Sequence, residues 1–472
     1  MNSCPVSDRN SLHRVPGRNL GGRAIGWPAA LFRRRMARRL LARNASALPL
    51  RRVTVWAAGF LLAASAVRAD ADFQGATHLM PFDEDTIKYS KTAANDAITR
   101  LQTRLDRGEV KLKREEHFGY LRSVLEALQV PKSSQTLVFS KTSFQRERIG
   151  PETPRALYFN DEVYIGFVVG SPLLEISTAD PKLGGVFYTM EQTAAEKQRL
   201  VRSDQCLECH ASAKTMGVPG HLVRSFEVDA GGVVNLATGT SLVSHRTPLA
   251  DRWGGWYVTG THGAQTHRGN LFGAAALAKQ EKSPNFQGNL TRLDNFFPVK
   301  NYPLPTSDIV ALMVLDHQLH MHNFITRLNY ESTLALSAYG HLNYLKNITD
   351  SFLNYLLFTE EAPLTDAVKG VSAFTTEFAA AGPRDRRGRS LRQFDLKTRL
   401  FKYPCSYLIY TDAFDALPAP MKAQVYQRLH EILTGKDTSA AFQKIPTETK
   451  RAILEILRET KPGLPDYWRA KK

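Results

Sequence analysis

The chain has 472 residues, of which 43% are hydrophobic, and it carries a formal net charge of +17. Residues 1–69 hold 13 arginines and one aspartate, so that the remainder of the chain carries only +5. So mild a charge excludes nucleic acid as a partner of the mature chain. Only three of the four cysteines follow residue 69, too few for a disulfide framework, and packing must therefore hold the fold.

Residues 1–69 are predicted to be a signal segment for export. An arginine pair precedes the apolar run 53–67, and a small-residue site follows it, so that cleavage is expected after Ala69. The run is short for a membrane span; no stable span is expected after cleavage, and a retained anchor is the alternative. A more ordinary signal begins at Met36, which is the candidate true start. We therefore expect a periplasmic or otherwise extracytoplasmic protein.

The next segment is predicted to be helical and is followed by strands. Apolar residues recur at helical spacing over residues 84–130, which end at a proline. Asn160-Asp161 is typical of a tight turn and predicts a hairpin between two of the strands that follow. The predicted strands, rich in β-branched and aromatic residues, are 136–140, 156–159, 163–169, 173–176 and 186–189.

The residues Cys206-Leu207-Glu208-Cys209-His210 form a Cys-x-x-Cys-His motif. Two thiols one helical turn apart suit thioether bonds to both vinyl groups of one porphyrin, and His210 then lies under the iron as its proximal ligand. A zinc knuckle would need a second ligand pair, which the chain lacks. A thioredoxin-like pair would follow a buried strand, whereas polar residues precede this motif. A disulfide is the third alternative, and it gives no reason for the histidine.

Strand signals continue after the motif and then give way to helices. Residues 222–228 and 233–236 flank a turn of Asp, Ala and two Gly, which predicts a second hairpin. Glycines bound a predicted strand over 254–260, and residues 271–305 are expected to be a long connection. The predicted helices are 309–339, capped by Ser307-Asp308, then 343–358, 364–380, 420–433 and 448–460.

These patterns predict an α+β fold in two domains. A strand-rich haem-binding domain with an N-terminal helical segment is expected over residues 70–300, and an all-α domain over residues 301–472. Cys405 in the helical domain is expected to be a buried small hydrophobic residue.

At its Cys-x-x-Cys-His motif the chain resembles c-type cytochromes, with no departure over the five residues. Residues 134–142, 155–161 and 252–260 also resemble segments of uncharacterised secreted bacterial haem proteins. The resemblance implies one covalent haem c, held by Cys206 and Cys209 and ligated by His210. It implies no particular reaction, and the predicted strands around the motif depart from small all-helical cytochromes.

The second axial position of the iron separates electron carriers from haem enzymes, because two strong ligands leave no vacant face. Histidines in loops and on the first predicted helix of the second domain are candidate distal ligands. They are His245, His262, His267 and His317. Met216 and His221 follow the motif so closely that the chain would have to wrap the porphyrin edge at once, and the alternative for His221 is a surface histidine.

Other residues offer further contacts to a haem or a metal. His317, His320 and His322 share one segment and are a candidate site for a second metal, with an ordinary polar helix face as the alternative. The candidate partners of the haem propionates are Arg224, Arg246 and Arg252. Trp253, Trp256 and Tyr257 either line the ring or belong to the core.

The leading expectation is a periplasmic single-haem carrier that exchanges one electron with a redox partner protein. A chain of about 400 residues after cleavage is longer than a simple carrier needs, and two alternatives therefore stay open. One is a haem enzyme with an open distal site, resembling a peroxidase or a reductase and acting on a small oxidant. The other is a haem-based sensor.

Overall fold

The computed structural model describes residues 79–194 and 197–469. The predicted signal segment, with its cleavage site at Ala69 and the candidate start at Met36, lies outside the described residues. By its contacts the described chain forms one unit, in which two short helices precede the strands and most of the helices follow them, and the fold is α+β as predicted.

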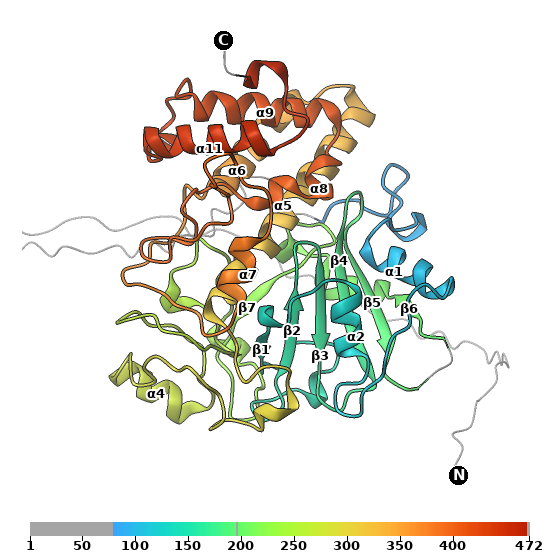
Figure 1. The fold of residues 1–472 in the computed structure, drawn as a ribbon, viewed down its shortest axis with the longest axis vertical. Coiled ribbons are helices and arrows are strands. Elements are labelled where there is room, and N and C mark those ends of the chain that lie inside the picture. Colours follow the sequence, from blue (N-terminus) through green and yellow to red (C-terminus); the bar gives the residue numbers. More distant parts are fainter. Residues whose placement is uncertain (1–78, 195–196, 470–472) are drawn as a thin grey trace, which may run out of the picture. The chain divides into compact units, whose positions relative to one another are not determined.

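A seven-stranded antiparallel sheet has the strand order β6-β5-β4-β3-β2-β1-β9 (Figure 1). Its strands are β1 (Thr136–Val138), β2 (Arg155–Phe159), β3 (Val163–Phe167), β4 (Leu173–Asp180), β5 (Gly184–Glu191), β6 (Leu200–Arg202) and β9 (Trp256–Tyr257). The five strands predicted before the motif are confirmed. The predicted turn also closes the β2–β3 hairpin, where Asn160 N donates to Val163 O at 3.1 Å.

The two faces of the sheet pack against different parts of the chain, because successive side chains of a strand point to opposite sides. Tyr158, Ile165 and Ile176 share one face and pack in a cluster with α1 (Ala97–Asp106) and α2 (Leu121–Ala127), which Figure 1 shows against the sheet. The opposite face, which we call the motif face, carries Phe159, Tyr164, Ser177 and Phe187.

The helical prediction over residues 84–130 is only partly right. Two short helices form, and residues 107–120 between them are not helical. Asp96 caps α1 with a reciprocal capping box, whereas Gly108 adopts a φ of +71° just after the helix end. Such a left-handed residue ends a helix even where the apolar spacing continues.

The chain after the motif contains one ribbon of two short strands. β7 (Val223–Ser225) pairs with β8 (Ser241–Val243), and the predicted strand 233–236 makes only a single bridge, from Val234 to Val228. Asp229 still forms the predicted turn, since its carboxylate accepts from the backbone N–H groups of Gly231 and Val233, each at 2.8 Å. The hairpin prediction was therefore right about the turn and about part of the first strand, and wrong about the second strand and the pairing.

The remaining helices are α3 (Leu207–His210), α4 (Ala274–Lys282), α5 (Ile309–Tyr339), α6 (Lys346–Leu356), α7 (Phe374–Ala380), α8 (Asp412–Asp415), α9 (Ala419–Leu433), α10 (Ala440–Gln443) and α11 (Thr447–Thr460). α4 lies inside the predicted connection 271–305, where alanines favour a helix. α7 covers only the end of the predicted helix 364–380, because residues before it pair with other loops, as in the bond from Val368 N to Leu396 O.

Helix α5 packs on the motif face and joins the strands to the helices. Gln318 donates to the hydroxyl of Tyr164 on β3 at 2.7 Å, and His322 Nε2 donates to the carbonyl of Asp161 at 2.8 Å. The predicted domain boundary at residue 300 falls in a short 3₁₀ turn, Val299–Asn301, and remains a prediction. Within the described ranges, no helix combines the length and the apolar character needed to cross a membrane.

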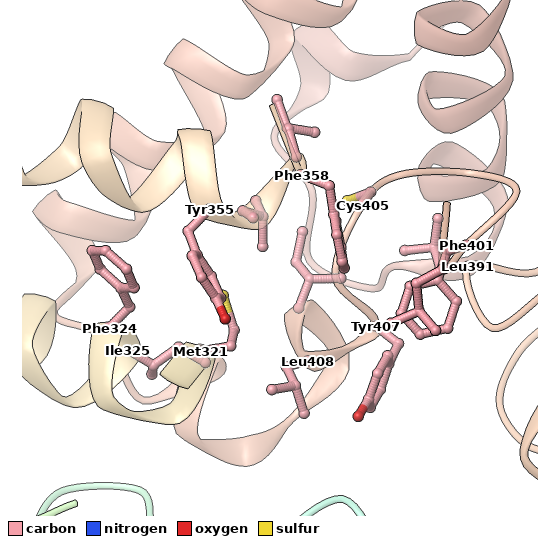
Figure 2. Close-up of a cluster of buried hydrophobic side chains, with 14 of the residues drawn as sticks. Met321, Phe324, Ile325, Tyr355, Phe358, Leu391, Phe401, Cys405, Tyr407 and Leu408 are labelled. Atoms are coloured by element: carbon pink, nitrogen blue, oxygen red, sulfur yellow. The ribbon is translucent and has the colours of Figure 1, made fainter. Parts of the chain in front are cut away.

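A large apolar cluster, which we call the α5 cluster, fills the space between α5, α6 and the loops after α7 (Figure 2). Tyr355 of α6 lies beside Met321 and Phe324 of α5, and its ring is 5.1 Å from that of Phe324. Cys405 belongs to this cluster and is fully buried, which confirms the prediction of a buried small residue. Burial also raises the pKa of its thiol well above the usual range.

The cap of α5 yields a prediction about stability. Asp308 is buried, and its Oδ1 accepts from Val310 N and Ala311 N, while Oδ2 accepts from Val371 N and from both N–H and hydroxyl of Ser372. Asp308→Ala is expected to lower the free energy of unfolding by about 3 to 5 kcal/mol, because a cap and several buried donors lose their acceptor. Asp308→Asn keeps one acceptor and is expected to cost about half as much in denaturant unfolding; equal losses would contradict this account.

Candidate haem-attachment site

The Cys-x-x-Cys-His motif lies on two short helical turns at the edge of the sheet. Strand β6 leads into a 3₁₀ turn, Asp204–Cys206, which continues as α3, and Ser203 N donates to Phe187 O at 2.9 Å. Cys206 is half-buried and Cys209 is exposed, and both are free thiols. Helical spacing places the two sulfurs on one side of the turn. The thiols are therefore reachable from solvent.

His210 is oriented by a single backbone carbonyl. Its Nδ1 lies 3.0 Å from Gly220 O, and Gly220 N donates in return to His210 O at 2.8 Å. A carbonyl oxygen can only accept, so Nδ1 carries the proton and Nε2 of the neutral ring keeps its lone pair. Burial lowers the pKa of His210, and the Gly220 carbonyl opposes that shift. The ring is thus held neutral in the tautomer that can ligate a metal through Nε2.

Aromatic rings of the motif face support this histidine. The ring of Phe187 is 4.7 Å from that of His210, and the ring of His221 lies 5.4 Å from Phe187 and 6.4 Å from His210. His221 is only 5% exposed, which rules out the alternative of a surface histidine. The loop after the motif folds back onto the sheet, where His221 Nε2 lies 3.0 Å from Ser177 Oγ.

An ion pair that the sequence analysis missed lies near the motif. Arg155 on β2 and Glu175 on β4 approach to 2.5 Å on the motif face. Both act on the motif, since the pKa of Cys206 is raised by burial and then by Glu175 and lowered by Arg155. Gly166 on β3 leaves room for the pair, because a Cβ there would meet the Arg155 guanidinium at 2.4 Å. The available signal was a pair of opposite charges, one directly before the predicted strand 156–159 and one on the predicted strand 173–176.

The three candidate propionate arginines lie in different surroundings. Burial lowers the pKa of the Arg224 guanidinium and the nearby Cys209 opposes that shift, and the guanidinium lies 4.3 Å over the ring of Phe226. Arg246 pairs with Glu360 at 2.8 Å. Arg252 is buried, and its guanidinium donates to Thr247 O and His245 O and contacts Asp316. Arg224 is therefore the one of these three that the structure brings to the motif.

Two of the candidate distal ligands pair with each other. His245 Nδ1 and His317 Nδ1 are 2.8 Å apart, and His317 Nε2 lies 2.8 Å from Ser406 Oγ. Both rings pack against Phe358, at 4.4 and 4.3 Å. Burial is the largest cause that lowers the pKa of each imidazole well below its usual value. The pair is thus a neutral hydrogen-bonded unit in the core.

The other two candidates form a second pair. The rings of His262 and His267 are 4.9 Å apart, and His267 meets the ring of Trp253 at 5.8 Å. Burial lowers the pKa of His267 to about 3. Trp253 is fully buried at a φ of +69° and donates through Nε1 to Asp316 Oδ2 at 3.0 Å. The four distal-ligand assignments remain predictions, and each histidine has a neighbour of its own.

Trp253, Trp256 and Tyr257 are buried members of the core. Met216 is also buried and lies in the α5 cluster, with its carbonyl accepting from Arg327 at 2.9 Å. These positions agree with the core alternative for the aromatic residues.

The candidate second-metal residues on α5 do not converge. His317 contacts His245 and Ser406, His322 contacts the Asp161 carbonyl, and His320 packs on Tyr355 with ring centres 4.7 Å apart. Across residues 79–194 and 197–469, no group of three or more His, Cys, Asp and Glu side chains is arranged to hold a metal ion. His317, His320 and His322 therefore do not form a donor set for a second metal ion.

Comparison with known proteins gives no relative: no family model, curated protein or solved structure matches this chain. The chemistry of the site must be argued from its own residues. Two accessible thiols one turn apart, next to a neutral imidazole with a free Nε2, form the donor set that covalent haem attachment requires.

Proposed function

We propose that this protein is an exported, extracytoplasmic haem c protein that transfers one electron at a time to or from a redox partner. Cys206 and Cys209 would anchor one haem, and His210 would be its proximal ligand. The bound haem would supply reversible one-electron exchange at its iron. Each thioether forms when an S–H adds across a vinyl C=C, so attachment needs no leaving group and no oxidant.

The observation that carries this proposal is the hydrogen bond from His210 Nδ1 to Gly220 O. In metal sites, the histidine nitrogen that does not ligate donates to a carbonyl or carboxylate, which fixes the tautomer and the ring orientation. A zinc knuckle, a thiol redox pair or a disulfide would not require this histidine to be oriented. The half-buried Cys206 and the exposed Cys209 leave space for a bulky group at the motif.

The chain surrounds the site with groups that suit a charged, partly apolar cofactor. Arg224, coupled to Cys209, offers a guanidinium for a propionate. Arg155 and Glu175 place a second charged pair near Cys206 and His210. These charges act on the site through a partly buried environment, where screening by salt is weak.

A second candidate function is a haem enzyme or sensor with an open distal position. The pairing of His245 with His317, and of His262 with His267, favours it, because each candidate ligand already has a buried neighbour. In that case the chain binds a small molecule on the free face of the iron.

The experiment is to express the full chain in a host that exports proteins and matures haem c, and then to record its mass and spectra. The proposal expects a mass increase equal to one haem, a reducible absorbance spectrum, and a reduced form that does not bind carbon monoxide. A haem-loaded protein that binds carbon monoxide readily would support the second candidate. A colourless protein with no mass adduct would overturn both.

A further inference from the structure

We propose that Asn323 on helix α5 is a positioning residue for His210, acting through the loop that carries Gly220. This inference rests on the proposed haem function and assigns to α5 a role in it. The side chain of Asn323 would fix the carbonyl that sets the tautomer and the orientation of the haem ligand.

Asn323 holds both backbone groups of one residue. Its Oδ1 accepts from His221 N at 2.9 Å, and its Nδ2 donates to His221 O at 2.6 Å. Asparagine is unfavourable in a helix interior, because its side chain competes for backbone hydrogen bonds. Here Asn323 is 1% exposed, and its amide bonds the loop in place of its own helix. The Asn323 side chain on α5 thereby supplies the hydrogen-bond partners of the His221 backbone N–H and carbonyl.

His221, whose backbone groups Asn323 holds, directly follows Gly220, whose carbonyl orients His210. Gly220 accepts from His210 Nδ1 at 3.0 Å and donates to His210 O at 2.8 Å. Pro219 O accepts from Gly185 N on the sheet at 2.8 Å. The loop is therefore held by the motif helix, by β5 and by α5. The attachment from α5 is made by the Asn323 side chain, whereas the one from the motif helix includes the His210 ring itself.

Gly220 packs closely against the side chain of Asn323. A Cβ built on Gly220 would lie 2.2 Å from Asn323 Oδ1 and 3.4 Å from Thr215 Cβ. No side chain fits at residue 220 while Asn323 is present. Removal of the Asn323 side chain would relieve the closest contact, so the two positions are coupled.

The ring of His221 also packs against aromatic rings on the motif face of the sheet. Its ring lies 4.7 Å from that of Tyr164 and 5.4 Å from that of Phe187, which itself lies 4.7 Å from His210. A shift of residues 220–221 therefore displaces both the carbonyl partner of His210 and the ring that supports it. Loss of the carbonyl partner makes the ligand less basic, which stabilises the oxidised iron less.

The test compares Asn323→Ala with Asn329→Ala. Asn329 lies on the same helix and is 8% exposed, and it also donates across to another segment, the β4–β5 turn, at Pro181 O and 3.0 Å. In the haem-loaded protein, Asn323→Ala is expected to shift the oxidised-to-reduced equilibrium roughly tenfold toward the reduced form, a size typical of such supporting contacts. Asn329→Ala is expected to leave that equilibrium unchanged at a similar loss of stability.

A second readout needs no haem. In the full chain carrying Cys206→Ala and Cys209→Ala, nitrogen NMR of His210 reports which ring nitrogen is protonated. Asn323→Ala is expected to reduce the Nδ1-protonated fraction, and Asn329→Ala is not. If the wild-type chain never takes up haem, the proposed function fails, while this measurement still decides the role of Asn323.

Gly220→Ala supplies an independent variant that leaves α5 intact. Gly220→Ala alone is expected to shift the His210 tautomer and the redox equilibrium as Asn323→Ala does. The double variant Gly220→Ala/Asn323→Ala is expected to show shifts much smaller than the sum of the two single effects, because removal of the Asn323 side chain relieves its clash with the new Cβ. The proposal is overturned if folded Asn323→Ala and Gly220→Ala proteins both keep the wild-type tautomer and equilibrium. It is also overturned if Asn329→Ala shifts them equally.

Discussion

Replacement of both Cys206 and Cys209 by alanine is expected to abolish covalent haem completely. The sequence places no other thiol within the motif, and the two sulfurs are free and reachable from solvent. Each single variant keeps one thiol and is expected to carry a haem with one unreacted vinyl group, at a much lower yield. Intact-protein mass and the absorbance spectrum of the reduced protein measure both outcomes.

Cys405→Ala is the matched control. Its thiol is fully buried in the α5 cluster, away from solvent (Figure 2). The variant is expected to keep its full haem content and to lose roughly 1 kcal/mol of stability, as for removal of one buried group from a packed core. Full haem content in the double variant would refute the assignment. A mass two hydrogens below that of the dithiol chain, with no chromophore, would show that the motif forms a disulfide.

Acidification from pH 6 to pH 5 is expected to destabilise the fold strongly. Besides His210 of the motif, five buried histidines have lowered pKa values, chiefly because burial disfavours the charged ring: His221, His245, His267, His317 and His322. Such a group stabilises the native state above its unfolded pKa, near 6.5, and that stability is lost as the pH falls. On unfolding in acid, these five rings therefore take up protons.

Two buried carboxyl groups act in the opposite sense. Burial raises the pKa of Asp316 to about 7 against the opposing effect of Arg252, and it raises the pKa of Glu361 to about 7 as well. Both favour the native state at low pH and lose that contribution as the pH rises through 7. On unfolding between pH 5 and 6, the five histidines gain about five protons and the two carboxyl groups release about two, a net uptake of about three. The free energy of unfolding should therefore fall by about 4 kcal/mol for each pH unit of acidification. Maximal stability is expected near pH 6.5 to 7.

Denaturant unfolding at pH 5, 6 and 7, at constant ionic strength, measures this slope. Asp316→Asn removes one opposing carboxyl group and is expected to steepen the fall between pH 6 and 5 by about 1 kcal/mol. His117→Gln, at an exposed position, is expected to leave the slope unaltered. A flat profile between pH 6 and 5 would contradict the neutral burial of the histidines.

Several elements were predictable because their signals are local. α5 spans the predicted residues 309–339, since an aspartate caps its start and Gly340 with a φ of +71° ends it. The β2–β3 hairpin follows from its turn residues, and the motif is read from five consecutive letters. Predictions failed where apolar spacing continued through a helix end, as at Gly108, or where a short strand found a distant partner, as β7 did.

The sequence by itself determined the Cys-x-x-Cys-His motif, the α+β class, the main strands and α5, because each depends on neighbouring residues, spacing or caps. Only the tertiary structure decided what surrounds the motif. Arg155, Glu175, His221 and Asn323 reach it from β2, β4, a folded-back loop and α5, and their meeting depends on strand register and helix packing. The tertiary structure also placed His245 on His317, since a buried polar ring is paired only when a distant segment supplies its partner, and it brought the rings of His262 and His267, which share one loop, into contact.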